Sequence, residues 1–196
     1  GHPGWALGVT STRSAYKPRN LILQLVGKDT AGKLKYEVVA SNLRPELNKP
    51  YYVAVSVDLD ETGEAGVTFC MKDLSHDDAI PEWSSVSHKV VSGYANDEPL
   101  LIGGRSRSKT HRWDGLIDEV RLSGTALPKD VLGVVGRPLD DATVGWWTFE
   151  PDGLLSDRSS RGHDLAVGSS TSTVAEAAMV DLCQILMNSN EFLYVD

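Results

Sequence analysis

The chain has 196 residues and carries 19 lysines and arginines against 27 aspartates and glutamates, so its formal net charge is −8. Apolar residues make up 41% of it, which is typical of a globular protein. No apolar run approaches the roughly 18 residues that a membrane-spanning helix needs, so we expect no membrane span. The acidic balance argues against a nucleic-acid partner, because backbone phosphates require a clustered basic surface.

The two cysteines, Cys70 and Cys183, are too few for a disulfide-dense scaffold. They also lie far from the Cys-x-x-Cys spacing that is typical of metal and redox sites. We expect two buried free thiols, and a single disulfide is the alternative.

Alternation of apolar and polar residues dominates the chain from residue 5 to about residue 122 and predicts half-buried strands. The alternation is clearest at 5–9, 21–25, 34–38, 51–57 and 67–71. Turn-forming residues separate these segments, for example at 28–32, 48–50 and 61–63. Short strands joined by such turns predict an antiparallel sandwich or barrel and exclude a helical bundle.

The pattern changes after residue 125. Residues near 127–135 predict a short helix with Pro128 in its first turn, where the missing N–H costs little. A strand is predicted at 143–149, followed by a polar loop at 151–163 and a further strand at 164–167.

We expect a β domain over 1–168, followed at 169–196 by a linker, a helix and a docked tail. Thr173 and Glu176 have the spacing of a capping box. Apolar residues then recur at helical spacing, at Met179, Leu182, Cys183 and Leu186. An apolar stripe of this kind must be buried, so we expect this amphipathic helix to pack on the β domain.

Two motifs carry a family resemblance. Residues 100–104 read Leu-Leu-Ile-Gly-Gly, and 113–122 read Trp-Asp-Gly-Leu-Ile-Asp-Glu-Val-Arg-Leu. Together they resemble the closing motif of laminin-G-like, concanavalin A-like lectin/glucanase domains. Residues 144–149, Val-Gly-Trp-Trp-Thr-Phe, and 155–165, Leu-Ser-Asp-Arg-Ser-Ser-Arg-Gly-His-Asp-Leu, resemble the opening motif of the same family.

The two motifs stand in reversed order along the chain. The family's first and last strands are neighbours in one sheet, so a strand at 144–150 is expected to pair with 114–122 and to take the vacant first-strand place. The resemblance therefore implies a permuted antiparallel β-sandwich of the jelly-roll kind.

The final residues, 181–196, are similar to the end of large multidomain planctomycete proteins of unknown function. Those proteins join a cytochrome-c-like region, uncharacterised domains and a lectin-like module. The resemblance implies that the chain is the C-terminal part of a longer exported protein, periplasmic or at the cell surface. Other domains of that protein would then be its partners.

Glucanases of this architecture place catalytic carboxylates at alternating positions along one strand. The nearest candidates are Asp58, Asp60 and Glu64. The turn at Thr62-Gly63 removes Glu64 from the row, so we predict no catalytic site. A glycoside hydrolase remains an alternative.

A structural Ca²⁺ often lies between the two motifs in this family. The resemblance implies Asp118 and Asp157 as side-chain ligands, with carbonyl oxygens near Gly162 and His163, and Ca²⁺ prefers such oxygen ligands. The alternative is that Asp157 caps its own loop through an Asx turn and that Asp118 pairs with an arginine.

The segment 105–112 is basic although the chain as a whole is acidic. Its charged groups and the next residue form the predicted glycan-binding set, Arg105, Arg107, Lys109, His111, Arg112 and Trp113. A local positive field attracts sulfated or uronic polysaccharide, and laminin-G-like domains often bind anionic glycans through loop arginines and lysines. A solvated hairpin tip is the alternative reading of this loop.

We therefore predict a non-catalytic binding module for a carbohydrate, with an anionic glycan as one candidate, or for a protein. A purely structural domain that packs against the rest of a larger protein is the alternative. In the pair Trp146-Trp147, alternation predicts one ring in the core and one on the other face. The outward ring either stacks on a sugar or lies under the C-terminal helix, and we expect the second arrangement.

Overall fold

The computed structural model describes residues 3–105, 108 and 111–167. Within them the protein is mostly β, with antiparallel sheets, as predicted. One sheet has the order β1-β2-β3, a second has the order β4-β5-β6, and β7 and β8 form a separate pair. The elements are β1 (Gly4–Val9), β2 (Leu21–Lys28), β3 (Leu34–Ala40), β4 (Tyr51–Val57), β5 (Val67–Asp73), β6 (Glu82–Val86), β7 (Val120–Ser123), α1 (Lys129–Leu132) and β8 (Thr143–Trp147).

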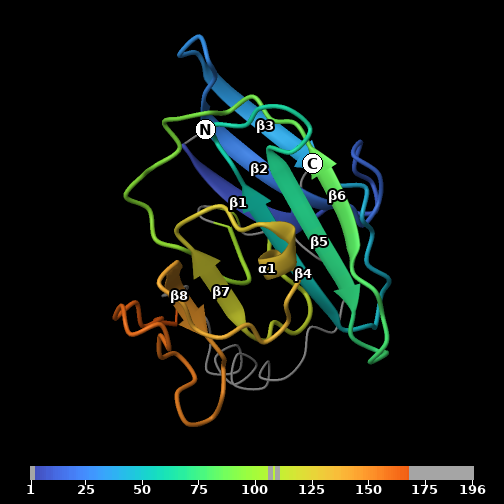
Figure 1. Cartoon of the computed structure of the whole chain (residues 1–196), viewed down its shortest axis with the longest axis vertical. Coiled ribbons are helices and arrows are strands. Elements are labelled where there is room, and N and C mark those ends of the chain that lie inside the picture. The colour runs from blue at the N-terminus through green and yellow to red at the C-terminus, as the bar shows by residue number, and fades with distance from the viewer. Residues whose placement is uncertain (1–2, 106–107, 109–110, 168–196) are drawn as a thin grey trace.

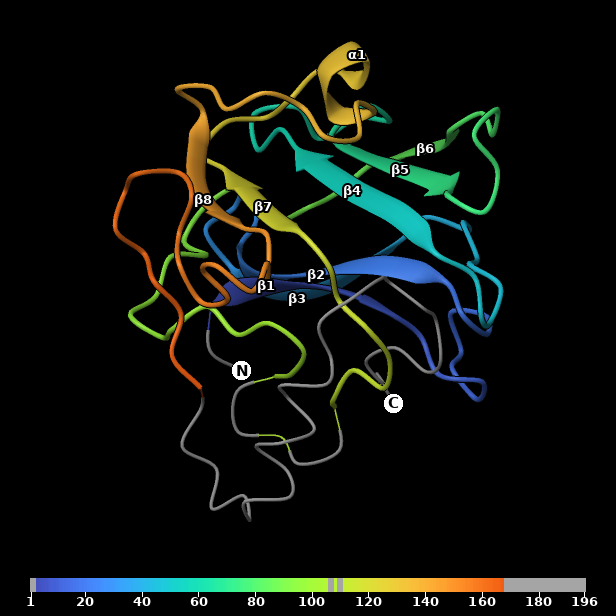
Figure 2. The ribbon, with the colours of Figure 1, turned by 90° about the horizontal axis from the view of Figure 1, so that it is seen from below.

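The two three-stranded sheets lie in two facing layers (Figure 2). Every second residue of their strands points into the space between them, because strand side chains alternate between faces. Both sheets contribute to one buried cluster, which also includes residues of two loops. Its members are Val9, Leu21, Leu23, Leu25, Val39, Leu43, Tyr51, Val67, Phe69, Met71 and Val90.

The central strand β2 is buried on both faces. Leu23 and Leu25 face the shared core, whereas Ile22, Gln24 and Val26 point the other way and are also less than 10% exposed. A strand that is covered on both sides needs an almost continuous apolar run, which explains why residues 21–26 are all apolar except Gln24.

The helix α1 lies on the outer face of the β4-β5-β6 sheet (Figure 2). The Tyr52 hydroxyl donates to the Leu132 carbonyl at 2.6 Å, and the Leu127 N–H donates to Ser56 Oγ at 2.8 Å. The Lys129 ammonium lies 5.8 Å from the centre of the Trp83 ring. The predicted helix near 127–135 is therefore present but is confined to Lys129–Leu132.

β7 and β8 pair antiparallel, with Val120 opposite Trp147 and Arg121 opposite Trp146. The predicted pairing of 144–150 with 114–122 is therefore present in part, since it is confined to 120–123 and 143–147, which lie side by side in Figure 1. Within the described residues the pair joins neither three-stranded sheet, so it forms a small sheet of its own.

The strand predicted at 164–167 is wrong, because the structure has no regular element there. Asp164 and Leu165 instead anchor the preceding loop, in which the Asp157 N–H donates to Asp164 Oδ1 and the Leu165 N–H donates to the Leu155 carbonyl. The predicted linker, helix and tail at 169–196 lie outside the described residues. In the described part of the chain, no helix is long and apolar enough to cross a bilayer.

Candidate functional site

The basic loop is a hairpin whose base is held by backbone contacts. Gly104 and Arg112 form an antiparallel bridge, and the Trp113 N–H donates to the Gly103 carbonyl at 2.9 Å. Gly103 has a φ of 77°, a conformation that suits glycine. The Trp113 indole N–H donates to the Leu116 carbonyl at 3.2 Å and so fixes the ring beside the hairpin. We call residues 103–113 the basic hairpin.

Two of the predicted cations of the basic hairpin are described, Arg105 and Arg112, while Arg107 and Lys109 lie outside the described residues. Arg112 is exposed and Arg105 is half-buried. Neither guanidinium forms a hydrogen bond or an ion pair with another described residue. His111 is different, because its Nδ1 is hydrogen-bonded to Ser108 Oγ. Arg105 and Arg112 are therefore available to an external anion, whereas His111 already serves the loop.

Asp157 is the best-buried carboxylate of the loop after β8, and its side chain is 0% exposed. Its Oδ1 accepts hydrogen bonds from the N–H groups of Trp146 and Ser159, at 3.0 and 2.8 Å. Its Oδ2 accepts from the Ser159 hydroxyl at 2.7 Å and from the His163 N–H at 3.0 Å. Burial alone would raise the pKa of Asp157, but these hydrogen bonds outweigh it and hold the pKa well below its usual range.

The four donors make Asp157 an anchor for its loop. The contact with Ser159 N–H is the Asx turn expected in the alternative to Ca²⁺ binding. A cation bound at this carboxylate would have to displace N–H and O–H groups whose positive ends already point at the oxygens. Arg158 N–H donates to the Trp146 carbonyl at 2.7 Å, so the loop also runs along β8 through its backbone.

The other predicted calcium ligands are placed as follows. Asp118 is exposed on the segment before β7, and Gly162 and His163 lie in the loop that Asp157 anchors. The His163 Nδ1 lies 2.7 Å from the Val144 carbonyl. Among the described residues, no three His, Cys, Asp or Glu side chains form a group that could hold a metal ion. Asp118, Asp157 and His163 therefore do not form such a group.

Arg121, which the sequence analysis assigned no role, joins β7 to the segment that follows α1. Its guanidinium donates to Thr143 Oγ1 at 2.6 Å and to the carbonyls of Arg137 and Pro138 at 2.6 and 2.8 Å. Asp140 lies 3.5 Å away and also accepts from the Thr143 hydroxyl. That hydroxyl and the two arginines lower the pKa of Asp140. An arginine within an apolar strand was the signal in the sequence that could have identified this cluster.

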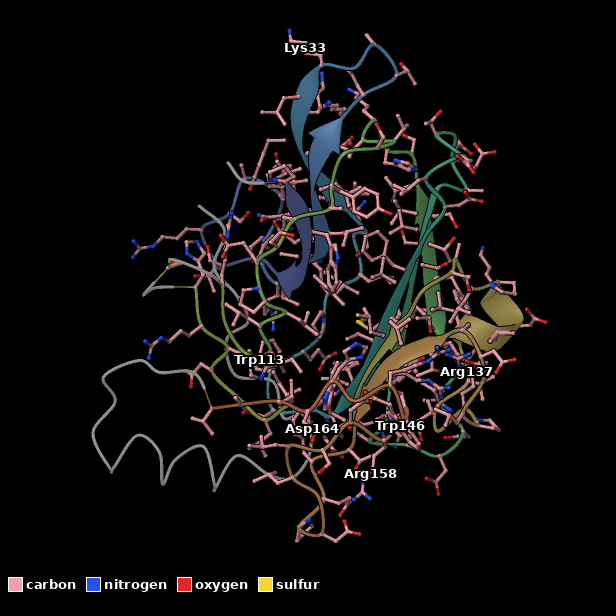
Figure 3. The ribbon with its side chains drawn as sticks, turned by 90° about the vertical axis from the view of Figure 1, so that its left-hand side faces the viewer. Lys33, Trp113, Arg137, Trp146, Arg158 and Asp164 are labelled. Carbon is pink, nitrogen blue, oxygen red and sulfur yellow. The ribbon has the colours of Figure 1, made fainter. Side chains whose placement is uncertain are left out.

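The pair Trp146-Trp147 divides between the two faces of β8, as predicted. Trp147 is 3% exposed and its indole N–H donates to the His163 carbonyl at 2.9 Å. Trp146 points the other way, and its indole N–H donates to Glu119 Oε1 at 3.1 Å while the Arg121 guanidinium lies 5.6 Å from its ring centre. Trp146 and Arg137 lie near each other at the end of the molecule opposite to Lys33 (Figure 3). The Trp146 ring is thus covered in part by an arginine that is itself held in place.

The acidic residues considered for glycoside hydrolysis lie in the loop between β4 and β5 rather than in a row along a strand. The Asp58 carboxylate accepts from the Asp60 N–H at 3.1 Å, and the Glu61 carboxylate accepts from the Gly63 N–H at 2.6 Å. Asp60 and Glu64 are exposed. These carboxylates shape a solvated turn, in agreement with the reading that Glu64 leaves the row.

A polar cavity of about 400 Å³ lies between the segment after α1 and the loop that Asp157 anchors. It is lined by Leu139, Asp140, Asp141, Ser159, Ser160 and Arg161. The Arg161 guanidinium donates to the Asp141 carbonyl at 3.1 Å, so it joins the two sides of this cavity.

Comparison with known proteins finds no relative of this chain. No family model matches the chain, and neither a curated protein nor a solved structure matches it.

Proposed function

We propose that this chain is a non-catalytic binding module with a concanavalin A-like, laminin-G-like β-sandwich fold, and that it recognises an anionic glycan through the basic hairpin. The observation that carries the proposal is the pair Arg105 and Arg112. Both side chains lack an acidic partner among the described residues of a chain whose net charge is −8. Two cations on one hairpin of an acidic chain give a local positive field.

Two facing antiparallel sheets with a common core support the sandwich part of the proposal. The pairing of β7 with β8 supports the permuted order, because it joins the two motif segments that resemble the family's last and first strands. The finer assignment to the concanavalin A-like fold rests on those motifs.

The chemistry of the hairpin favours sulfate or carboxylate groups as ligands. A guanidinium presents a planar array of N–H donors that matches two oxygens of such an anion. Trp113, fixed beside the hairpin by its bond to Leu116, adds a flat apolar surface on which a sugar ring can stack. Binding by exposed arginines is screened by salt, so the affinity is expected to fall as ionic strength rises.

Calorimetric titration with a heparin-derived oligosaccharide tests this proposal, and a neutral laminarin oligosaccharide serves as the comparison ligand. We expect binding of the sulfated probe only. Replacing both arginines, Arg105→Ala with Arg112→Ala, is expected to weaken binding by about tenfold, which corresponds to about 1.4 kcal/mol from two charge contacts at the surface.

The matched control replaces Arg13 and Lys33 by alanine, because both are exposed and the net charge changes by the same amount. Lys33 lies at the far end of the molecule from Trp113 (Figure 3). Equal loss of binding in the two double variants would reduce the effect to net charge and refute a site at the hairpin. Absence of binding to either oligosaccharide would favour the structural packing domain.

A further inference from the structure

The strand β3 lies at the edge of its sheet. Within the described residues it pairs with β2 alone, and its register with β2 is continuous along the strand. A continuous register leaves this edge straight, without a bulge that would turn it away from a partner. The β2–β3 hairpin projects from one end of the molecule (Figure 1), and Lys33 lies at its tip (Figure 3).

Alternate residues of β3 direct their backbone groups away from β2. Just past the end of β3, Ser41 N–H donates to the Leu21 carbonyl at 3.0 Å, so the odd-numbered residues form the hydrogen-bonded pairs with β2. The N–H and carbonyl groups of Leu34, Tyr36 and Val38 therefore point outward. They form no hydrogen bond to another part of the described chain. A row of such donors and acceptors is a template for a further strand.

Apolar side chains line the same edge. Leu34 is 59% exposed and Tyr36 is 52% exposed. Val39 belongs to the shared core, so Leu34, Tyr36 and Val38 lie together on the opposite face of the sheet. Pairing with another strand would cover apolar surface on this face at the same time as it satisfies the backbone groups.

The charges on β3 fit a second copy of the same strand. Lys35 and Glu37 lie two positions apart on one face and carry opposite charges. When two copies run antiparallel with Tyr36 opposite its own counterpart, Lys35 of each copy lies opposite Glu37 of the other. Leu34 of each copy then lies opposite Val38 of the other. This register forms two ion pairs, one aromatic pair and two apolar pairs, all of which stabilise a sheet.

Other registers are less favourable. A pairing centred on Lys35 would set two ammonium groups opposite each other, and one centred on Glu37 would set two carboxylates opposite each other. A pairing centred on Val38 would form neither ion pair. Glu37 Oε2 accepts a hydrogen bond from Lys89 N–H at 2.7 Å, which holds this side chain at the edge. Its Oε1 can accept from Lys35 of a second copy.

We propose that the chain forms a symmetric homodimer through β3, in which two copies of this strand pair antiparallel about Tyr36. The two β1-β2-β3 sheets then join into one continuous sheet. A two-fold pairing uses the same patch twice, so each favourable contact occurs in duplicate. A single edge strand carries the interface, and an interface of this size gives weak association. We therefore expect a dimer that dissociates on dilution.

Sedimentation velocity over a dilution series tests the dimer, with the wild type, Lys35→Glu and the control variant Arg13→Glu measured in parallel. Lys35→Glu turns both ion pairs into like-charge contacts and should weaken association by about tenfold. Arg13→Glu changes the net charge by the same amount, but Arg13 is exposed on the loop at the other end of β2, so we expect no change. A monomer at every concentration would overturn the proposal, as would equal dimerisation of the wild type and Lys35→Glu. Equal weakening by both variants would reduce the effect to net charge and would also overturn it.

A mixture of two variants distinguishes the register from a general loss of stability. Lys35→Glu and Glu37→Lys each set like charges opposite each other in their own homodimer. One chain of each restores two pairs of opposite charge. The equimolar mixture should therefore associate more tightly than either variant alone, and a mixture that does not would refute the proposed register.

Amide hydrogen exchange of the wild type needs no variant. The N–H groups of Tyr36 and Val38 gain acceptors in the dimer, so their exchange should slow as the protein concentration rises. The Glu37 N–H faces β2 and should exchange slowly at every concentration. Exchange at Tyr36 and Val38 that does not depend on concentration would contradict the dimer.

Discussion

Replacing Asp157 by asparagine changes one buried atom and leaves the side-chain shape almost intact. The carboxylate accepts four hydrogen bonds, two at each oxygen. Asparagine keeps one oxygen and places an NH₂ group where the other oxygen stood. The NH₂ group then faces either the N–H groups of Trp146 and Ser159, or the His163 N–H and the Ser159 hydroxyl, which can turn to accept from it.

The cost follows from the number of bonds lost. A hydrogen bond to a charged acceptor contributes about 1.5–3 kcal/mol, so losing at least one gives about 1.5 kcal/mol as a lower bound. For a chain of 196 residues, 1 kcal/mol corresponds to a fall in Tm of about 2–4 °C. We therefore expect Asp157→Asn to lower the Tm by at least about 3–6 °C at pH 7.

The dependence on pH provides a second signature. The folded-state pKa of Asp157 lies below that of an unfolded aspartate, about 3.9. The stabilisation is therefore complete well above pH 4 and is lost as the pH falls toward the folded-state pKa. The difference in unfolding free energy between wild type and Asp157→Asn should shrink between pH 5 and pH 2.

Urea unfolding followed by tryptophan fluorescence measures both effects. Asp152→Asn is the matched control, because its carboxylate is 78% exposed and pairs with Arg158 on the surface of the same loop. Such surface pairs contribute about 0–1 kcal/mol. If Asp157→Asn were no more destabilising than Asp152→Asn, the reasoning from the four hydrogen bonds would be refuted.

Three further predictions concern the core and its edges. Gln24 is 3% exposed, and its amide nitrogen has no hydrogen-bond partner among the described residues. Gln24→Met should therefore raise the unfolding free energy by about 1–2 kcal/mol. A lower urea midpoint for this variant would contradict the prediction. Arg121→Lys should lower the unfolding free energy by about 2–3 kcal/mol, because an ammonium cannot reach Thr143 and two carbonyls together. Amide hydrogen exchange at 137–143 should become faster. Unchanged exchange there would count against the role of Arg121 in joining these segments. Burial raises the pKa of the Cys70 thiol to about 11, so the thiol should react slowly with alkylating reagents at pH 8. Peptide mapping after alkylation should find Cys70 modified only in urea. Rapid modification of the folded protein would disprove this prediction.

Local residue patterns were enough to locate most of the strands. The alternation at 51–57 corresponds to β4 residue for residue, because a strand with one face on the core and one outside must alternate. The same reasoning gave the start of β2 but stopped at residue 25, whereas the strand continues to Lys28. Gly27 interrupts the apolar run there, and only the packing of residues 90–94 against it explains why the strand continues.

The predicted strand at 164–167 shows where local patterns fail. Its last three residues are apolar, as in a short buried strand, but Asp164 and Leu165 bond to the loop at 155–157 instead of to a neighbouring strand. Strand formation requires a partner edge, and no pattern within four residues reports whether one is available.

The sequence likewise predicted some features of the candidate site and missed others. Composition alone identified the basic hairpin, because the charge of a segment is a local property of the sequence. The role of Asp157 as an anchor depends on N–H groups from β8 and from its own loop, and Arg121 acquires its partners from residues 16–22 positions away. The sequence by itself determined the β class, the main strands and the basic segment, since these follow from residue type and spacing. Only the tertiary structure decided which buried polar groups face one another, because those contacts join segments far apart in the chain.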